Sequence, residues 1–289
     1  MSAWTATDLP SFAGRTVIVT GANSGLGLVT ARELARAGAD VVLAVRNTAK
    51  GEEAAAAMSG NVTVRPLDLQ NLASVREFAA ATDEIDVLVN NAGIMATPYA
   101  QTVDGFESQI GTNHLGHFAL TNLLLPKVSD RVVTVSSFMH VLGRINLSDL
   151  NWKARPYSAW LAYGQSKLAN LLFTSELQNR LRRAGSPVRA LAAHPGYSHT
   201  NLQGQSGRKL SDAVMGIGGQ YLATDADFGA RQTLYAVAED LPGDAFVGPR
   251  FVMRGPTGPA WRTPLARDMR MAAALWELSE QLTDTKFAL

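Results

Sequence analysis

A tyrosine and a lysine four residues apart are the side chains with the clearest chemical potential in this sequence. Tyr163 and Lys167 precede a run of helix-forming residues, 168–173. In a helix, residues i and i+4 lie on one face, so the phenol and the ammonium would be neighbours. A free phenol loses its proton near pH ~10, and a neighbouring ammonium lowers that pKa. Such a pair can exchange a proton with a substrate oxygen, although the same spacing also occurs on solvated helix faces.

A glycine-rich turn near the N-terminus could bind a phosphate. Gly21, Gly25 and Gly27 lie in the run 20–27, which follows the β-branched run 16–19 and opens a helix-like segment. Strand, glycine turn and helix in this order predict a pyrophosphate on the free N–H groups of the helix N-terminus. Gly21 would allow the turn, Gly25 the approach of the pyrophosphate, and Gly27 the packing of helix on strand. An ordinary glycine turn is the alternative.

Strand-like and helix-like segments alternate along the chain and must position these residues. Apolar, strand-like runs occur at residues 16–20, 41–45, 62–65, 87–90, 131–136, 188–193 and 246–252. Helix-like stretches occur at residues 25–37, 49–58, 72–81, 104–127, 157–184, 228–238 and 269–282. The alternation predicts an α/β fold of the Rossmann type, doubly wound around a mainly parallel, seven-stranded sheet, in a single domain 1–289.

Further motifs in the same order give the chain a resemblance to the short-chain dehydrogenases/reductases. They are Asn90-Asn91-Ala92-Gly93, Asn113 in Gly-Thr-Asn-His, Ser137 at the end of Val-Thr-Val-Ser-Ser, and His194-Pro195-Gly196 with Thr200. The resemblance runs from about residue 15 to about residue 200 and implies four catalytic residues, Asn113, Ser137, Tyr163 and Lys167. The cofactor-binding residues that it implies are Gly21, Asn23, Ser24, Gly25, Leu26, Gly27, Arg46, Asp68, Leu69, Asn91, Ala92, Gly93, Tyr163, Lys167, Pro195, Gly196 and Thr200.

The resemblance also implies a role for each catalytic side chain. Tyr163 would donate a proton to a carbonyl oxygen in reduction, or accept one in oxidation. Lys167 would lower the pKa of Tyr163 and hold the nicotinamide ribose. Ser137 would polarise the carbonyl, with Ser136 as the alternative residue. Asn113 would connect Lys167 to solvent through water.

The end of the second strand-like run favours NADP(H) over NAD(H). An acidic residue there would bind the ribose 2′-hydroxyl of NAD(H), but residues 43–45 include no acid and Arg46 follows. A guanidinium matches a 2′-phosphate in geometry and charge. Lys50 could assist, and Asp68 resembles the adenine-side aspartate of the family. A solvated arginine at a strand end is the alternative reading of Arg46.

The spacing between the serine and the tyrosine narrows the subfamily. Ser137 and Tyr163 are 26 positions apart, a long spacing that resembles the retinol-dehydrogenase-like branch and, less closely, the protochlorophyllide reductase branch. The expected substrate is an apolar aldehyde, ketone or alcohol, and a substrate lid is expected at about 197–225. Residues that flank the motifs form the candidate pocket: Met95, Met139, His140, Leu142, Tyr197 and His199.

Composition limits the other classes of function. The chain has 289 residues, 46% of them hydrophobic, with a net charge of +1, no cysteine and five histidines without a ligand spacing. We therefore expect no nucleic-acid partner, no metal and no disulfide. The sequence contains no apolar run of about 18 residues, the length that would predict a membrane span. We therefore expect a cytoplasmic protein.

The sequence leaves an alternative function open and also leads to an expected oligomeric state. A non-catalytic NADP(H) sensor on the same fold is the alternative function, and a nucleotide-sugar epimerase is disfavoured by the glycine spacing. The resemblance also implies a homodimer or homotetramer, paired through the helices that begin near Asp104 and Tyr157. Apolar residues on these helices could serve either the core or that interface: Leu120, Leu123, Leu124, Leu168, Leu171, Leu172 and Phe173.

Overall fold

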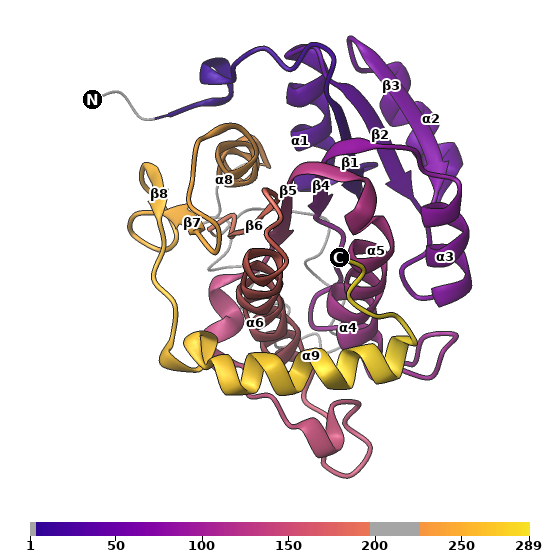
Figure 1. Ribbon diagram of the computed structural model, residues 1–289, viewed down its shortest axis with the longest axis vertical. Helices are drawn as coiled ribbons and strands as arrows, with labels where there is room; N and C mark the ends of the chain where they lie inside the picture. The colour runs from indigo at the N-terminus through magenta and orange to yellow at the C-terminus, as the bar shows by residue number, and fades with distance from the viewer. Residues whose placement is uncertain (1–3, 197–225) are drawn as a thin grey trace.

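Eight strands form a single sheet in the part of the chain that this computed structural model describes, residues 4–196 and 226–289. Their order is β3-β2-β1-β4-β5-β6-β7-β8, and all neighbours pair in parallel except β7 and β8 (Figure 1). The strands are β1 (Thr16–Thr20), β2 (Asp40–Val45), β3 (Asn61–Pro66), β4 (Ile85–Asn90), β5 (Val128–Val135), β6 (Arg189–Ala193), β7 (Phe246–Pro249) and β8 (Thr257–Pro259). The predicted doubly wound, mainly parallel α/β fold is confirmed.

The strand count corrects the sequence analysis, which predicted seven strands. The additional strand, β8, has only three residues, two of them Gly258 and Pro259, and both residue types are depleted in strands. It forms a hairpin with β7, whose predicted extension to residue 252 is also wrong. The chain turns after Pro249, where the Val252 N–H donates to the Pro249 carbonyl over 2.9 Å.

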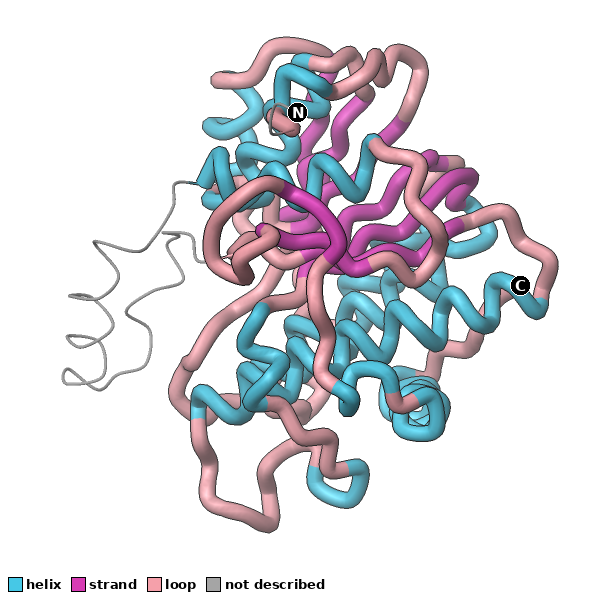
Figure 2. The backbone as a smooth tube through the Cα atoms, turned by 90° about the vertical axis from the view of Figure 1, so that its left-hand side faces the viewer, coloured by secondary structure: helices cyan, strands magenta, loops and turns pink. Residues whose placement is uncertain are grey.

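Helices cover both faces of the sheet, as Figure 2 shows for the strands enclosed between them. The helices that share a core with one face are α1 (Gly25–Arg36), α2 (Thr48–Ala56) and α8 (Ala226–Ala238). Those that share a core with the other face are α3 (Leu72–Ala80), α5 (Gly116–Leu124) and α6 (Ala159–Arg183). Central strands therefore lose both faces to burial, which explains their continuous apolar sequences: Val17, Ile18 and Val19 of β1 are fully buried.

The strand order reverses between β1 and β4. β1 pairs with β2 on one side and with β4 on the other, so the connections that leave their carboxyl ends run to opposite faces of the sheet. A crevice outside the carboxyl ends of the strands is expected at such a reversal in an open α/β sheet.

The predicted helix 104–127 is interrupted, which is a second correction. It consists of a short α4 (Ser108–Ile110), one π-helical stretch η2 (Gly111–Leu115), α5 and a 3₁₀ turn η3 (Leu125–Lys127). The π-helical stretch contains Asn113, whose side chain hydrogen-bonds the backbone of Ile94. Hydrophobic periodicity cannot reveal one inserted residue in a helix, although such insertions are frequent at functional sites.

The C-terminal helix α9 (Met269–Thr283) packs across α6 and α5 (Figure 1). The Trp276 ring stacks on Phe173, with centroids 5.7 Å apart, and meets Phe118 edge-on at 4.8 Å. The apolar residues that could have served a core or an interface are buried within the chain, apart from Leu123, which is partly buried. In this structure those side chains serve the core.

Candidate active site

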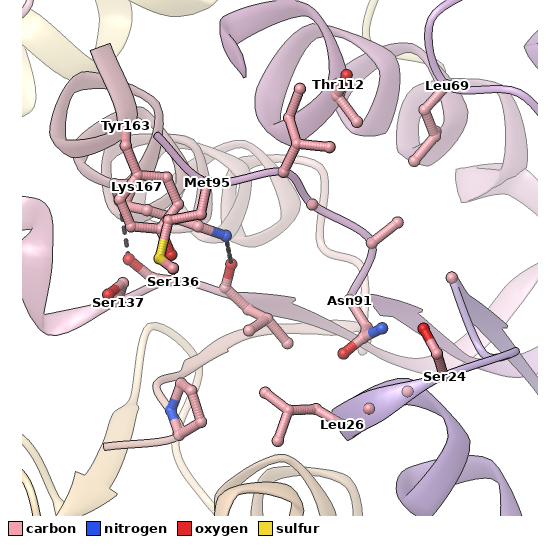
Figure 3. A pocket seen from close by; sticks show the side chains of 18 of the residues that line it. Ser24, Leu26, Leu69, Asn91, Met95, Thr112, Ser136, Ser137, Tyr163 and Lys167 are labelled. Atoms are coloured by element: carbon pink, nitrogen blue, oxygen red, sulfur yellow. Dashed lines mark hydrogen bonds between the residues drawn. The ribbon is translucent and has the colours of Figure 1, made fainter. Parts of the chain in front are cut away.

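A cavity of about 970 Å³ lies at the carboxyl ends of the strands. Among the described residues that line it are every predicted cofactor-binding residue from Gly21 to Gly196, together with Ser137. Thr200 and the expected lid lie outside the described residues. The short motifs of the sequence therefore converge on one cavity, and Figure 3 shows residues from both of its ends.

The glycine turn leaves no room for side chains. Gly21 has φ +66°, and a Cβ there would lie 2.9 Å from the Cβ of Ala92. A Cβ on Gly27 would lie 2.6 Å from the Gly21 carbonyl oxygen and would also meet the Asn91 amide. That amide donates to the Thr20 carbonyl over 2.8 Å and so joins the ends of β1 and β4. The turn thus packs backbone against backbone, as a phosphate-binding turn requires.

The N-terminus of α1 points free N–H groups toward the cavity. Ser24 is the N-cap residue, and its side chain caps none of these groups. The first turn of a helix has N–H groups without intrahelical partners, and the helix dipole favours an anion there. Ser24 and Leu26 both line the cavity at this point (Figure 3). The cradle fits a pyrophosphate.

Two exposed cations, Arg46 and Lys50, line the same end of the cavity. Asn47, between them, caps α2 by accepting a hydrogen bond from the Lys50 N–H over 3.0 Å. Within residues 4–196 and 226–289, no carboxylate forms an ion pair with Arg46. Asp68 and Leu69 line the neighbouring wall, and the Asp68 carboxylate accepts from the Gln70 N–H over 2.9 Å.

Tyr163, Lys167 and Ser137 gather at the other end of the cavity (Figure 3). The Lys167 ammonium lies 5.7 Å from the centre of the Tyr163 ring and donates to the Val135 carbonyl over 3.0 Å. Ser136 differs from Ser137, because its hydroxyl is buried and donates to the Lys167 carbonyl over 2.8 Å. Ser137 is therefore the serine whose hydroxyl is available to a substrate.

The pKa of Tyr163 shifts in the direction opposite to the expected one. Burial raises it to about 12, while a hydrogen bond with Ser137 acts to lower it. Burial also lowers the pKa of Lys167 to about 8. Desolvation disfavours the charged form of both groups, and it outweighs the attraction that the sequence analysis invoked. At neutral pH the phenol is consequently protonated and able to donate.

Asn113 lies behind Gly93 rather than in the cavity wall. Its side-chain oxygen accepts from the Ile94 N–H over 2.8 Å, and its amide donates to the Ile94 carbonyl and to the Ser166 hydroxyl, each over 2.9 Å. A Cβ on Gly93 would lie 3.1 Å from that oxygen and 3.6 Å from the Lys167 ammonium. Asn113 is therefore close to Lys167, but its side chain holds the loop after β4.

A buried histidine, His117, reinforces this segment. The Nδ1 of His117 lies 3.2 Å from the Asn113 carbonyl oxygen, and its Nε2 lies 2.9 Å from the Thr20 hydroxyl. Burial lowers the pKa of His117 to about 3, so the ring is neutral. The ring links the end of β1 to the π-helical stretch.

The substrate end of the cavity was only partly predicted. Met95 and Met139 line it as expected, and Phe138, Trp160 and Met253 line it as well. Trp160 could have been found, because it lies three residues before Tyr163 on one helix face. Two predicted pocket residues, His140 and Leu142, do not line the cavity. The two others, Tyr197 and His199, fall outside the described residues.

The two wrong candidates face elsewhere. His140 is buried, and its Nδ1 lies 2.8 Å from the Ser137 carbonyl oxygen, so it supports the serine from behind. Leu142 is exposed on the surface. In the described part of the chain, no cluster of histidine or acidic residues could hold a metal ion, and no helix has the length and apolar character to cross a bilayer.

Comparison with known proteins gives the class. The family model for short chain dehydrogenase matches residues 15–211. A crystal structure of an uncharacterised protein from Mycobacterium paratuberculosis is 68% identical, with a TM-score of 0.90 and full coverage of both chains. A structure from Beutenbergia cavernae, described as an NAD(P)-dependent gluconate 5-dehydrogenase with bound NADP, is 26% identical over 82% of this chain and 96% of that one, with a TM-score of 0.63. The chain belongs to the short-chain dehydrogenase/reductase family.

Its relatives also place it within that family. Human retinol dehydrogenase 13 is 44% identical over 93% of this chain and 84% of its own length. Human retinol dehydrogenase 12 is 41% identical over 93% of this chain and 86% of its own length. The chain is an oxidoreductase of the retinol-dehydrogenase-like branch, and the family uses a nicotinamide cofactor.

Proposed function

We propose that this protein is an NADP(H)-dependent oxidoreductase that transfers hydride between the nicotinamide and an apolar aldehyde or ketone, or the matching alcohol. The observation that carries the proposal is one continuous cavity with two chemically different ends. One end presents a helix N-terminus and two cations, and the other presents a protonated phenol among methionine and aromatic side chains. A dinucleotide suits the first end and an apolar carbonyl suits the second.

The residues of the first end would hold the cofactor. The N–H groups at Gly25 to Gly27 would bind the pyrophosphate, Asp68 and Leu69 would adjoin the adenine, and Asn91 to Gly93 would adjoin the ribose and nicotinamide. Pro195, Gly196 and Thr200 would complete the nicotinamide side. When bound, the cofactor supplies the hydride.

NADP(H) is proposed over NAD(H) because of Arg46. Its exposed guanidinium lines the cavity close to Lys50, where it could pair bidentately with a 2′-phosphate. An acid that would accept from a ribose 2′-hydroxyl does not stand at the end of β2, where Ala44 and Val45 precede Arg46. The Beutenbergia cavernae structure contains bound NADP, which is compatible with this proposal.

The side chains at the second end would handle the proton. Tyr163 donates its phenolic proton to the carbonyl oxygen in reduction and accepts a proton from the alcohol in oxidation. Ser137 donates a hydrogen bond to the same oxygen and stabilises the charge that develops on it. Lys167 places an ammonium beside the phenol and holds the ribose, and Asn113 positions the loop that adjoins both.

The apolar lining supports an apolar substrate. Met95, Met139 and Met253 are flexible and polarizable, and Phe138 and Trp160 add flat surfaces.

A cytoplasmic location and a homodimer or homotetramer remain parts of the proposal. The named apolar side chains of α5 and α6 are largely buried in the core, so such an oligomer would use other side chains of these helices or of the surface.

A substrate screen tests the proposal. Linear and ring-bearing aldehydes, ketones and alcohols are offered to the purified protein with NADPH, NADH or the oxidised cofactors, and the absorbance of the reduced nicotinamide is followed. We expect turnover of apolar carbonyls with NADPH and weak turnover with NADH. Tight NADPH binding without turnover of any compound would favour the sensor, and turnover only in light would favour a protochlorophyllide-reductase-like enzyme.

A further inference from the structure

A short loop after β4 forms one wall of the substrate end. Ile94 and Met95 line the cavity, and the next residue, Ala96, is buried with φ +50°. A non-glycine residue in this left-handed region is uncommon and persists only where its surroundings enforce the conformation. The contacts around Ala96 must therefore hold its backbone in this left-handed conformation.

Hydrogen bonds from outside the loop hold its backbone at successive residues. Asn113 accepts from the Ile94 N–H and donates to the Ile94 carbonyl. The Ala96 N–H donates to the Gln109 side-chain oxygen over 2.8 Å. The Tyr157 hydroxyl lies 3.1 Å from the Thr97 carbonyl oxygen, which accepts from it. The loop is thus fixed on both sides of Ala96.

The two outer partners are themselves joined in a buried network. The Gln109 amide donates to the Tyr157 hydroxyl over 2.8 Å and to the Ala159 carbonyl over 2.9 Å. The Tyr157 hydroxyl also lies 3.0 Å from the carboxylate of Glu107. That carboxylate accepts the N–H groups of Gln109 and Ile110, each over 2.9 Å. Gln109 and Glu107 are fully buried, so a lost partner would leave a costly unsatisfied group.

The parts of this network come from the segment beside the π-helical stretch and from the long segment between Ser137 and Tyr163. Gln109 lies one helical turn before Asn113, next to the π-helical stretch. Tyr157 belongs to the long segment between Ser137 and Tyr163, and its ring packs edge-on against Trp152 with centroids 5.8 Å apart. The long spacing therefore supplies a side chain that reaches the substrate wall.

We propose that Gln109 and Tyr157 are positioning residues that determine which apolar substrates the enzyme accepts, by fixing residues 94–97 and hence Met95 in one conformation. The inference rests on the proposed function, because it assigns a role within the same cavity. The thioether of Met95 remains flexible, but its backbone anchor does not move. The fixed anchor limits the width of the substrate end.

Removal of the Tyr157 hydroxyl should release this wall. Tyr157→Phe keeps the ring that packs on Trp152 and removes the hydroxyl, which binds the Thr97 carbonyl and the Glu107 carboxylate and accepts from the Gln109 amide. Gln109→Met keeps the length of the side chain and removes the acceptor of the Ala96 N–H. In both variants Ala96 can relax from its left-handed conformation, and Met95 can then move away from the cavity. A wider ring-bearing substrate should gain more than a slim linear one.

The test is the ratio of kcat/KM for a ring-bearing apolar aldehyde to that for a linear one, with NADPH. A ratio is unaffected by the fraction of protein that is folded, so a merely structural defect would not change it. We expect a shift of about tenfold toward the wider aldehyde in each variant, the usual effect of a pocket contact. The double variant should shift by less than the product of the single shifts, because both residues act through one loop.

Tyr235→Phe is the matched control. It removes a phenol on α8, on the opposite face of the sheet, where the ring packs against Trp4, and it should leave the ratio unchanged. Hydrogen exchange gives a readout without activity: the amides of residues 94–97 should exchange faster in Tyr157→Phe, while those of β1 should not.

An unchanged ratio and unchanged exchange in Tyr157→Phe and Gln109→Met would overturn the inference while leaving the proposed function intact. If the unaltered protein reduces neither aldehyde, the proposed function itself fails. Faster exchange at residues 94–97 without a change in the ratio would also overturn the inference, because the loop would then move without affecting the substrate.

Discussion

The two ends of the cavity are built in different ways. At the cofactor end, one continuous run of eight residues, 20–27, supplies the turn, and its backbone atoms form the candidate phosphate site. At the substrate end, Met95, Met139, Trp160 and Met253 come from four separate segments and act through their side chains. Binding of the common cofactor thus depends on local backbone geometry, whereas the choice of substrate depends on tertiary contacts between distant parts of the chain.

The largest expected effect separates chemistry from cofactor binding. Tyr163→Phe should lower turnover by about two to four orders of magnitude, since it removes the proton donor and keeps the ring. NADPH affinity should hardly change, because the pyrophosphate and phosphate contacts lie at the other end. Steady-state rates and equilibrium binding measure the two effects, and near-normal turnover would contradict the role of Tyr163.

Gly27→Ala should have the opposite profile. The added Cβ would meet the Gly21 carbonyl oxygen at 2.6 Å and the Asn91 amide, so the turn must move. Overpacking of this kind costs up to about 3 kcal/mol, or about a hundredfold in NADPH affinity. Gly258→Ala is the matched control, since a Cβ there would meet nothing within 4 Å. Equal loss in both variants would show that the turn is not the binding element.

Arg46→Ala should affect only the choice of cofactor. Loss of a charge-assisted pair is worth about 2 kcal/mol, so the affinity for NADPH should fall about thirtyfold while that for NADH stays constant. Lys50→Ala, at the same end, should cause a smaller change in the same direction. Equal affinities for NADPH and NADH in the unaltered protein would refute the preference for NADP(H).

Lys167 provides the smallest effect, a dependence of stability on pH. Burial lowers the pKa of Lys167 to about 8, whereas the unfolded lysine titrates near ~10.4. Between these values the unfolded state binds more protons, so the free energy of unfolding should rise with pH. This contribution is about 1 kcal/mol per pH unit near pH ~9.

Lys167→Met should remove that rise. Chemical denaturation of both proteins at several pH values measures the difference. Lys50→Met, which removes an exposed lysine at the cofactor end, is the matched control and should leave the rise in place. Parallel curves for Lys167→Met and the unaltered protein would show that the ammonium is not desolvated.

The contrast between the two ends also explains what could be predicted from the sequence. Strands β1 to β6 and the turn at Gly21 to Gly27 follow from short patterns, and both were placed within a few residues. The π-helical stretch at Asn113 and the three-residue β8 have no such pattern, because tertiary hydrogen bonds and a hairpin partner define them. His140 was assigned to the pocket by its place in the sequence, although its side chain points away from the cavity.

The pKa of Tyr163 shows the same limit. The spacing of Tyr163 and Lys167 predicted their proximity correctly, but the direction of the shift depends on burial, which only the assembled fold reveals. A local motif identifies which groups meet, and the surrounding structure determines their protonation.

The transfer of a deuteride tests the central claim most directly. NADPH that carries deuterium at both positions of the nicotinamide C4 is incubated with the protein and an apolar aldehyde, and the alcohol product is analysed by mass spectrometry. The account predicts one deuterium on the carbinol carbon of the product and almost none with Tyr163→Phe in the same time. Bound NADPH without deuterium transfer to any aldehyde or ketone would contradict it.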